Sequence, residues 1–189
     1  MKKILFIRHG ATAGNLEKRY IGITDEPLVT EGTQQVMRLR ERGITADYVF
    51  VSPLLRARQT AEILFPGKQV TIVDELKETN FGQFEGKSAA EMVDDIAYRT
   101  WVDTMCLGPI PGGEDISAFK TRCCCAFQDL IKAVSDNTIV ALVTHGGVIM
   151  SILERFAVPR RGFYEYQVQN GSCLFGEYDG QSIHLKKLR

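Results

Sequence analysis

The sequence of 189 residues lacks net charge, long apolar runs and an export segment. Its 23 basic residues balance 23 acidic ones, and therefore no overall field attracts nucleic acid or an acidic membrane surface. No apolar stretch approaches the length of a bilayer-spanning helix, and the short run after Met1 ends at Arg8, too early for a signal peptide. These absences predict a cytoplasmic protein that binds neither nucleic acid nor membrane. With 44% apolar residues, the composition is that of one domain spanning 1–189.

Motifs for metals and nucleotides are also missing. The sequence contains no Cys-x-x-Cys pair, no His-x-x-x-His pair and no Walker loop. Its five cysteines are an odd number, which indicates free thiols. Cys123, Cys124 and Cys125 are consecutive, and on a helix their side chains point about 100° apart, so that they cannot converge on one ion. Cys123 belongs to an apolar helical stripe and is predicted to be buried. The sequence therefore predicts neither a metal site nor a cofactor.

Strand and helix patterns alternate along the chain with short connections. Strands are predicted at residues 3–7, 48–51, 70–73, 139–143, 166–168, 173–178 and 183–185. Helices are predicted at residues 30–43, after Ser52 as N-cap, and at 88–103, 114–134 and 146–156. This alternation predicts an α/β fold, a three-layer α/β/α sandwich with a mostly parallel central sheet whose last strand or two runs antiparallel at an edge. Residues 77–113 form an irregular insertion that is predicted to cover the active site.

Two of the three histidines stand at the ends of apolar strand patterns, and a glycine follows each. In a parallel sheet the carboxyl ends of the strands share one edge, where ligands bind, and so His9 and His145 are expected to face each other. The glycines let a ligand approach the main-chain amides closely. Arg8 adds a planar cation that pairs with carboxylate or phosphate oxygens. The sequence therefore predicts a site for an oxyanion.

Several sequence blocks match one known family in order and spacing. They are Arg8-His9-Gly10-Ala11-Thr12-Ala13-Gly14-Asn15, Gly22 with Asp25 and Pro27-Leu28, residues 52–61, Leu76-Lys77-Glu78 with Gly82 and Glu85-Gly86, Pro111-Gly112-Gly113-Glu114, and Val143-Thr144-His145-Gly146-Gly147. Together they cover nearly the whole chain and resemble the motifs of the histidine phosphatase superfamily, also called the phosphoglycerate mutase-like family. The resemblance implies that family's three-layer fold and phosphoryl transfer through a phosphohistidine.

Arg56 stands early in the helix predicted after Ser52, where a cation opposes the helix macrodipole at a cost of about 0.3 to 1 kcal/mol. Another interaction should therefore hold this charge in place. The resemblance implies that Arg56 aims at the same oxyanion as Arg8. Arg58 lies about 200° further around the helix and is predicted to be a solvated surface residue.

Protonation of a leaving alcohol needs a carboxyl group within reach. The residue chemistry alone leaves several candidates open, namely Asp74, Glu75, Glu78 and Glu85. The resemblance selects Glu78 as the acid, whereas Glu85 is expected to brace the loop at 82–86. Glu114 is predicted in the first turn of the helix at 114–134, where its charge complements the helix dipole.

The matched residues imply a reaction in two steps. His9 attacks phosphorus while Glu78 protonates the departing alcohol, and water then hydrolyses the phosphohistidine with Glu78 as base. Arg8, Arg56 and a protonated His145 neutralise the charge of the transferring group. The further phosphate-binding residues that we predict are Asn15, Thr12, Gly22 and Gly146. No metal ion and no cofactor takes part in this reaction.

Two features bear on the substrate. Ala11 stands where the family commonly carries glutamate or another polar residue, which makes the site less negative. The insertion at 77–113 is shorter than in the mutases of the family, and the chain resembles its shorter phosphatases, including the α-ribazole-5'-phosphate phosphatases of cobalamin synthesis, which share its length and a segment like that around Trp101. The sequence thus predicts a phosphomonoesterase acting on a small phosphorylated metabolite. The alternatives are a cofactor-dependent phosphoglycerate mutase and a non-catalytic phosphate-binding domain, and assembly as a homodimer stays open.

Overall fold

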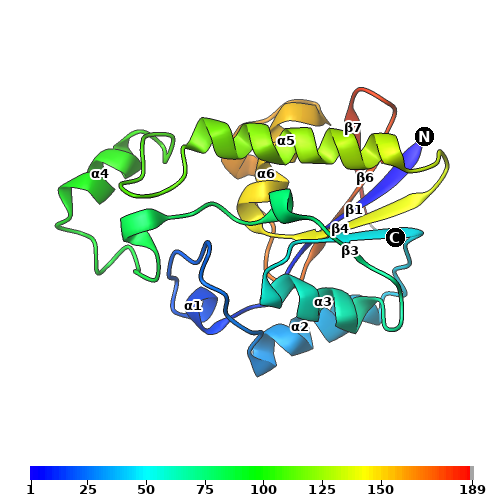
Figure 1. The fold of residues 1–189 in the computed structure, drawn as a ribbon, viewed down its shortest axis with the longest axis horizontal. Coiled ribbons are helices and arrows are strands. Elements are labelled where there is room, and N and C mark those ends of the chain that lie inside the picture. Colours follow the sequence, from blue (N-terminus) through cyan, green and yellow to red (C-terminus); the bar gives the residue numbers. More distant parts are fainter. Residues whose placement is uncertain (188–189) are drawn as a thin grey trace.

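The computed structural model of the protein describes residues 1–187, so that the end of the predicted range 1–189 lies outside the described part. Helices and strands alternate along the chain, as predicted (Figure 1). The strands are β1 Lys2–Arg8, β2 Tyr48–Val51, β3 Thr71–Ile72, β4 Ile139–Thr144, β5 Ala157–Val158, β6 Cys173–Tyr178 and β7 Ile183–Lys186. The helices are α1 Ala13–Leu16, α2 Thr30–Arg40, α3 Leu55–Leu64, α4 Ile96–Asp103, α5 Ile116–Ala133 and α6 Gly146–Phe156, with the 3-10 helices η1 Asp74–Leu76, η2 Gly82–Phe84 and η3 Phe163–Tyr166.

The described strands form one sheet in the order β3-β2-β4-β1-β6-β7-β5. The pairs β3–β2, β2–β4, β4–β1 and β7–β5 are parallel, whereas β6 runs antiparallel to both β1 and β7. The mostly parallel sheet is therefore confirmed. The prediction of an antiparallel strand at an edge is wrong, because β7 and β5 extend the sheet beyond β6.

Helices cover both faces of the sheet, with α5 and α6 on one face and α2 and α3 on the other (Figure 1). Successive side chains of a strand point to opposite faces. In β1, Ile4 and Phe6 therefore join the core under α5 and α6, and Leu5 and Ile7 join the core under α2 and α3. The three-layer α/β/α sandwich is confirmed. Among the helices of residues 1–187, none is long and apolar enough to cross a membrane.

Residues 77–113 leave the sandwich and carry α4 to one end of the molecule (Figure 1). They contain a small core of their own, whose buried side chains are Phe84, Met92, Tyr98, Trp101 and Ile110. The helix predicted at 88–103 is wrong in its first half, because α4 begins only at Ile96. The Asp95 carboxylate accepts hydrogen bonds from the N–H groups of Ala97 and Tyr98, and this N-cap starts the helix there.

The strand predicted at 166–168 is also wrong. Tyr166 ends η3. The Val168 carbonyl accepts a hydrogen bond from the side chain of Arg8, not from the main chain of a neighbouring strand. Tyr166 and Val168 are both buried in the core under α5 and α6. The alternating pattern therefore reflects burial of two side chains without strand pairing.

The cysteine predictions hold in the part of the chain that the structure describes. All five thiols are free; Cys123 is buried, Cys124 is half-buried and Cys125 is exposed. Burial raises the pKa of Cys123 and raises that of Cys124 to about 11. Both thiols are therefore protonated at neutral pH and serve as packing groups of α5.

Leu142 lies completely buried in the middle of β4. We expect Leu142→Ala to lower the free energy of unfolding by about 2 to 5 kcal/mol, because the truncation leaves a cavity between the sheet and α5. Leu107 is 55% exposed, and Leu107→Ala is the matched control, with an expected change within about 0.5 kcal/mol. Urea denaturation measures both variants. Equal losses of unfolding free energy in the two variants would contradict the central position of β4.

Candidate active site

The candidate site lies where β1 and β4 end side by side. The two strands are parallel neighbours with Arg8 opposite Thr144, so that His9 and His145 follow at the same edge. Their ring centroids are 5.0 Å apart, with an angle of 61° between the planes. The two histidines are 3% and 0% exposed. The prediction that they face each other is confirmed.

The main chain holds the ring of His9 in one tautomer. Nδ1 lies 2.7 Å from the carbonyl oxygen of Gly10, and this contact is a hydrogen bond when Nδ1 carries the proton. The other ring nitrogen, Nε2, accepts a hydrogen bond of 3.2 Å from Nε of Arg56. Burial, together with the positive charges of Arg56 and Arg8, holds the pKa of His9 well below its usual range. The ring is therefore neutral at pH 7 and has its lone pair on Nε2.

Arg56 is completely buried near the start of α3. Its Nη1 donates to the carbonyl oxygen of Thr24 at 2.8 Å, and its Nη2 donates to that of Gly22 at 2.8 Å. These bonds supply the interaction that its unfavourable place on the helix dipole requires. Within residues 1–187, neither Arg56 nor Arg8 forms an ion pair with a carboxylate. Arg58 is exposed, as predicted.

Ser52 orients His145, which is the N-cap residue of α6. Oγ of Ser52 lies 2.7 Å from Nε2 of His145. The prediction that Ser52 caps a helix is wrong, because α3 begins only at Leu55 and the hydroxyl is directed to the histidine. The position of Ser52 directly after a buried strand was the available signal for this role.

The protein's own charges favour a neutral His145. Burial, followed by the positive charge of Arg56, holds the pKa of His145 well below its usual range. In the protein by itself the ring is therefore neutral, and a protonated His145 stays a prediction for the ring next to a phosphoryl group. A phosphoryl group would act in the opposite direction, because its negative charge favours the protonated ring.

Two buried nitrogens at the site have no hydrogen-bond partner within residues 1–187, namely Nε of Arg8 and Nδ1 of His145. Arg8 donates from Nη1 to the carbonyl oxygen of Val168 at 2.7 Å. Its guanidinium lies next to Gly146, where an added Cβ would be 3.5 Å from Cζ. Buried polar groups are nearly always hydrogen-bonded, and so these two nitrogens are the expected contacts for ligand oxygens.

Thr12 and Asn15 form a capping box at the start of α1. The N–H of Thr12 donates to Oδ1 of Asn15 at 3.2 Å, and Asn170 donates to the same oxygen at 3.0 Å and to the carbonyl of His9 at 3.2 Å. Because Oδ1 is engaged, Nδ2 is the group that Asn15 offers to a ligand. Thr12 is completely buried and serves as the cap. Sequence analysis missed Asn170, which only the tertiary fold brings to the end of β1.

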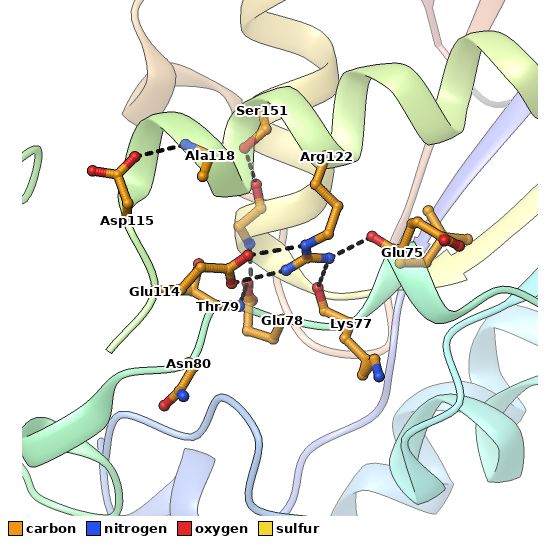
Figure 2. A network of polar contacts seen from close by, with 12 residues as sticks. Glu75, Lys77, Glu78, Thr79, Asn80, Glu114, Asp115, Ala118, Arg122 and Ser151 are labelled. Carbon is orange, nitrogen blue, oxygen red and sulfur yellow. Dashed lines mark hydrogen bonds and ion pairs between the residues drawn. The ribbon is translucent and has the colours of Figure 1, made fainter. Parts of the chain in front are cut away.

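Glu78 reaches the same edge of the sheet from the segment after η1 (Figure 2). Its Oε2 accepts a hydrogen bond of 3.0 Å from the N–H of Gly147 in α6, and its Oε1 accepts one of 3.0 Å from the N–H of Thr79. A Cβ on Gly147 would collide with Oε1 of Glu78, so that this close approach needs glycine. Glu78 is also among the charges that act on Arg8 and Arg56. The carboxylate therefore lies beside the histidines and their cations.

Three other acidic residues lie away from the histidines. Asp74 is exposed and pairs with Lys77 at 3.2 Å, and Glu75 is exposed. The prediction of Glu114 in the first turn of α5 is wrong, because Asp115 is the N-cap and the helix begins at Ile116. Glu114 forms an ion pair of 2.9 Å with Arg122. Of the acidic residues at 74–78, Glu78 alone contacts α6 at the site.

Glu85 braces its own loop, as predicted, and also a second loop. Its Oε2 accepts a hydrogen bond of 3.2 Å from the N–H of Phe81. Its Oε1 accepts hydrogen bonds from the N–H groups of Gly22 at 2.7 Å and Thr24 at 2.9 Å. The carbonyl groups of the same two residues hold Arg56. Gly22, which was predicted to bind phosphate, therefore uses its main-chain groups to hold Arg56 within the protein.

A cavity of about 1160 Å³ opens beside these groups. Next to the histidines it is lined by Arg8, Glu78 and Gly146. The outer lining includes the aromatic side chains Tyr20, Phe81, Trp101, Phe163 and Tyr164. His9 and His145 are almost completely buried and do not line the cavity themselves. Within residues 1–187, no cluster of His, Cys, Asp and Glu side chains is arranged to hold a metal ion.

Ala11 does not line this cavity. It is 2% exposed, and its N–H donates to Oε1 of Gln35 at 3.0 Å. Gly32 of α2 packs so closely that a Cβ there would collide with the carbonyl of Ala11. In this chain the position that departs from the family pattern is a packing position.

Comparison with known proteins agrees with this geometry. The sequence model of the histidine phosphatase superfamily (branch 1) matches residues 4–189. Phosphoglycerate mutase-like protein 4 of Arabidopsis thaliana is 33% identical over 187 residues, which cover 94% of this chain and 80% of the relative. The adenosylcobalamin/alpha-ribazole phosphatase of Salmonella typhimurium is 30% identical over 176 residues, which cover 89% of this chain and 87% of the relative.

Among solved structures, the phosphoserine phosphatase of Entamoeba histolytica in complex with 3-phosphoglyceric acid superposes with a TM-score of 0.84 at 27% identity. The superposition covers 99% of this chain and 96% of that one. Sequence and fold thus match over nearly the full length. The chain therefore belongs to the histidine phosphatase superfamily, branch 1, and is a phosphatase.

Proposed function

We propose that the protein is a metal-independent phosphomonoesterase that hydrolyses a small phosphorylated metabolite through a phosphohistidine on His9. In the first step Nε2 of His9 attacks phosphorus, the bond from phosphorus to the alcohol oxygen breaks, and Glu78 gives that oxygen a proton. In the second step Glu78 takes a proton from water, the water oxygen attacks phosphorus, the bond from phosphorus to Nε2 of His9 breaks, and inorganic phosphate leaves. Arg8 and Arg56 balance the charge of the transferring group, together with His145 once the negative charge of that group has favoured protonation of the ring.

The state of His9 carries this proposal. Its Nδ1–H donates to the carbonyl of Gly10, which leaves the lone pair on Nε2. Burial and two neighbouring cations keep its pKa low. The ring is therefore a neutral nucleophile at pH 7 and needs no separate base to deprotonate it.

The charges around His9 support the transfer of an anionic group. Arg8 and Arg56 bring positive charge that no carboxylate ion pair offsets within residues 1–187. The unpaired nitrogens of Arg8 and His145 offer hydrogen-bonding positions to phosphoryl oxygens. Phosphoryl transfer depends mainly on such positioning and electrostatic stabilisation. A non-catalytic phosphate-binding domain would have no need of Glu78 beside the nucleophile.

The cavity supports an alcohol with a flat apolar part. Its wall contains Tyr20, Phe81 and the exposed Tyr164, and aromatic side chains stack on planar rings. α-Ribazole-5'-phosphate joins a ribose phosphate to an aromatic base, and one relative is named as a phosphatase of α-ribazole. We propose this compound as the substrate. The free cysteines support the cytoplasm as the place of action.

Brief incubation with ³²P-labelled substrate should trap an acid-labile, alkali-stable phosphohistidine. The label should map to His9, because Nε2 of this residue carries no proton and has the lone pair that attacks phosphorus. His9→Ala should abolish the label and lower the rate by several orders of magnitude, with an unchanged circular dichroism spectrum. Rapid-quench analysis with peptide mapping measures both effects. A label on a cysteine would contradict the mechanism.

The aromatic wall should favour α-ribazole-5'-phosphate over ribose 5-phosphate, which loses the same kind of alkyl alcohol but has no base. We expect kcat/KM to be about 10 to 200 times higher for α-ribazole-5'-phosphate, the range for one apolar group in a pocket. Interconversion of 3-phosphoglycerate should be slower than hydrolysis of either ester. Equal kcat/KM values for the two esters would contradict α-ribazole-5'-phosphate as the substrate. Efficient mutase turnover would favour a phosphoglycerate mutase.

The low pKa of His9 can be measured directly. Protonation of Nε2 removes the nucleophile, and since the pKa is lowered, the neutral ring should persist as the pH falls below about 6.5, the ordinary value for histidine. Titration of ¹⁵N-labelled protein by NMR reports this protonation. Arg56→Ala should move the pKa of His9 upward, because it removes a nearby positive charge. A His9 signal that titrates at or above 6.5 in the unmodified protein would contradict this electrostatic account.

A further inference from the structure

One arginine fixes the segment that leads into Glu78 to helix α5 (Figure 2). Nη1 of Arg122 donates to the carbonyl oxygens of Glu75 at 2.5 Å and Lys77 at 3.1 Å. Its Nε and Nη2 donate to the two carboxylate oxygens of Glu114 at 3.0 and 2.9 Å. Such a two-point pair fixes the orientation of the guanidinium plane. The last residue that Arg122 holds is therefore the one that directly precedes Glu78.

The carbonyl group of Leu76, between those of Glu75 and Lys77, is held from the central sheet. Oγ1 of Thr144 donates to the carbonyl oxygen of Leu76 at 2.8 Å, and the side chain of Leu76 is completely buried. Thr144 is the last residue of β4 and precedes His145. The three consecutive carbonyl groups of 75–77 thus all accept side-chain hydrogen bonds. This arrangement sets the point from which the Glu78 side chain extends.

Arg122 itself does not line the cavity. Its guanidinium is engaged by Glu114 and by the two main-chain carbonyls, and Cζ lies 5.1 Å from the centre of the Phe119 ring. The side chains of Arg122 and Glu114 are 25% and 24% exposed, so that solvent screens the pair only in part. Arg122 therefore acts on the site through the residues that it holds and through its positive charge, which contributes to the lowered pKa of His145.

We propose that Arg122 is a positioning residue for Glu78, and that Glu114 keeps Arg122 aligned for this task. The proposal rests on the proposed role of Glu78 as general acid. The hydrogen bond from Gly147 holds the carboxylate end of Glu78, whereas Arg122 holds the main chain at the other end of the side chain. Both ends matter, because a displacement of about 1 Å can cost roughly a factor of 100 in rate.

The test compares Arg122→Gln, Glu78→Gln and the double variant on two phosphate esters. Ribose 5-phosphate has an alkyl leaving group that needs a proton, whereas p-nitrophenolate leaves readily without one. Rapid-quench measurement of phosphohistidine formation isolates the step in which the acid acts. We expect Arg122→Gln to slow this step about 10- to 100-fold for ribose 5-phosphate, part of the roughly 100- to 10,000-fold that a general acid contributes. With p-nitrophenyl phosphate the step should change little.

The double variant should be no slower than Glu78→Gln with ribose 5-phosphate, because residues that act as one unit are not additive. A purely structural role for Arg122 would instead slow both esters and add to the effect of Glu78→Gln, and either result overturns the proposal. Lys2→Gln is the control, since Lys2 forms an ion pair with Asp136 at 3.0 Å and neither residue lines the cavity. It should leave both rates unchanged.

Circular dichroism and the melting temperature show whether each variant folds. Should Arg122→Gln fail to fold, Glu114→Gln takes its place, because it weakens the alignment and keeps the arginine; equal slowing of both esters in that variant also overturns the proposal. Different results contradict the role of Glu78 as acid and the role of Arg122 as positioning residue. If Glu78→Gln slows both esters equally, Glu78 is not the acid; if it distinguishes them and the folded Arg122 or Glu114 variant does not, only the positioning role is wrong.

Discussion

A buried positive charge that main-chain carbonyls satisfy is the interaction on which the site depends. Arg56 is completely buried, and its guanidinium donates to the carbonyl groups of Gly22 and Thr24 and to Nε2 of His9. A buried charge is costly without such partners. A carboxylate partner would cancel the charge, whereas neutral carbonyls hold it and leave it available to an anion. The loop that supplies these carbonyls is in turn braced by Glu85 through N–H donors of Gly22 and Thr24.

The sheet supplies the second constraint, because three neighbouring parallel strands end at the same edge. β2, β4 and β1 are adjacent and in register, so that Ser52, His145 and His9 follow one another across that edge. Ser52 directly follows β2, and the contact of its Oγ with Nε2 of His145 joins the ends of β2 and β4. The positions of the two histidines therefore come from strand pairing, which is rigid, while α3 and the segment after η1 add Arg56 and Glu78 around them. A phosphoryl group would meet a row of polar groups whose spacing is set by the sheet.

Local patterns predicted much of this arrangement, because the features concerned are encoded within a few residues. The apolar runs before His9 and His145 indicated paired buried strands, and Arg56 was marked by its unfavourable place on a helix dipole. The contacts made across the fold were not visible in this way. Ser52 had the pattern of a helix cap, yet its hydroxyl is directed to His145. Asn170 is joined to the site through contacts with His9 and Asn15, which no local pattern reports.

Glu78 and His145 share their supports, which separates the strand ends of the site from the aromatic wall of the cavity. Thr144 and Gly147, on either side of His145, hold the carbonyl of Leu76 and the carboxylate of Glu78. Glu78 stands near the start of the insertion at 77–113, and the small core of that insertion begins further on, at Phe84, and is distinct from the two cores of the sheet. Changes in that core can therefore reshape the wall of the cavity while the strand ends keep the proposed nucleophile and the proposed acid in place. Such a division explains how relatives named for α-ribazole and for phosphoserine share one fold with this chain.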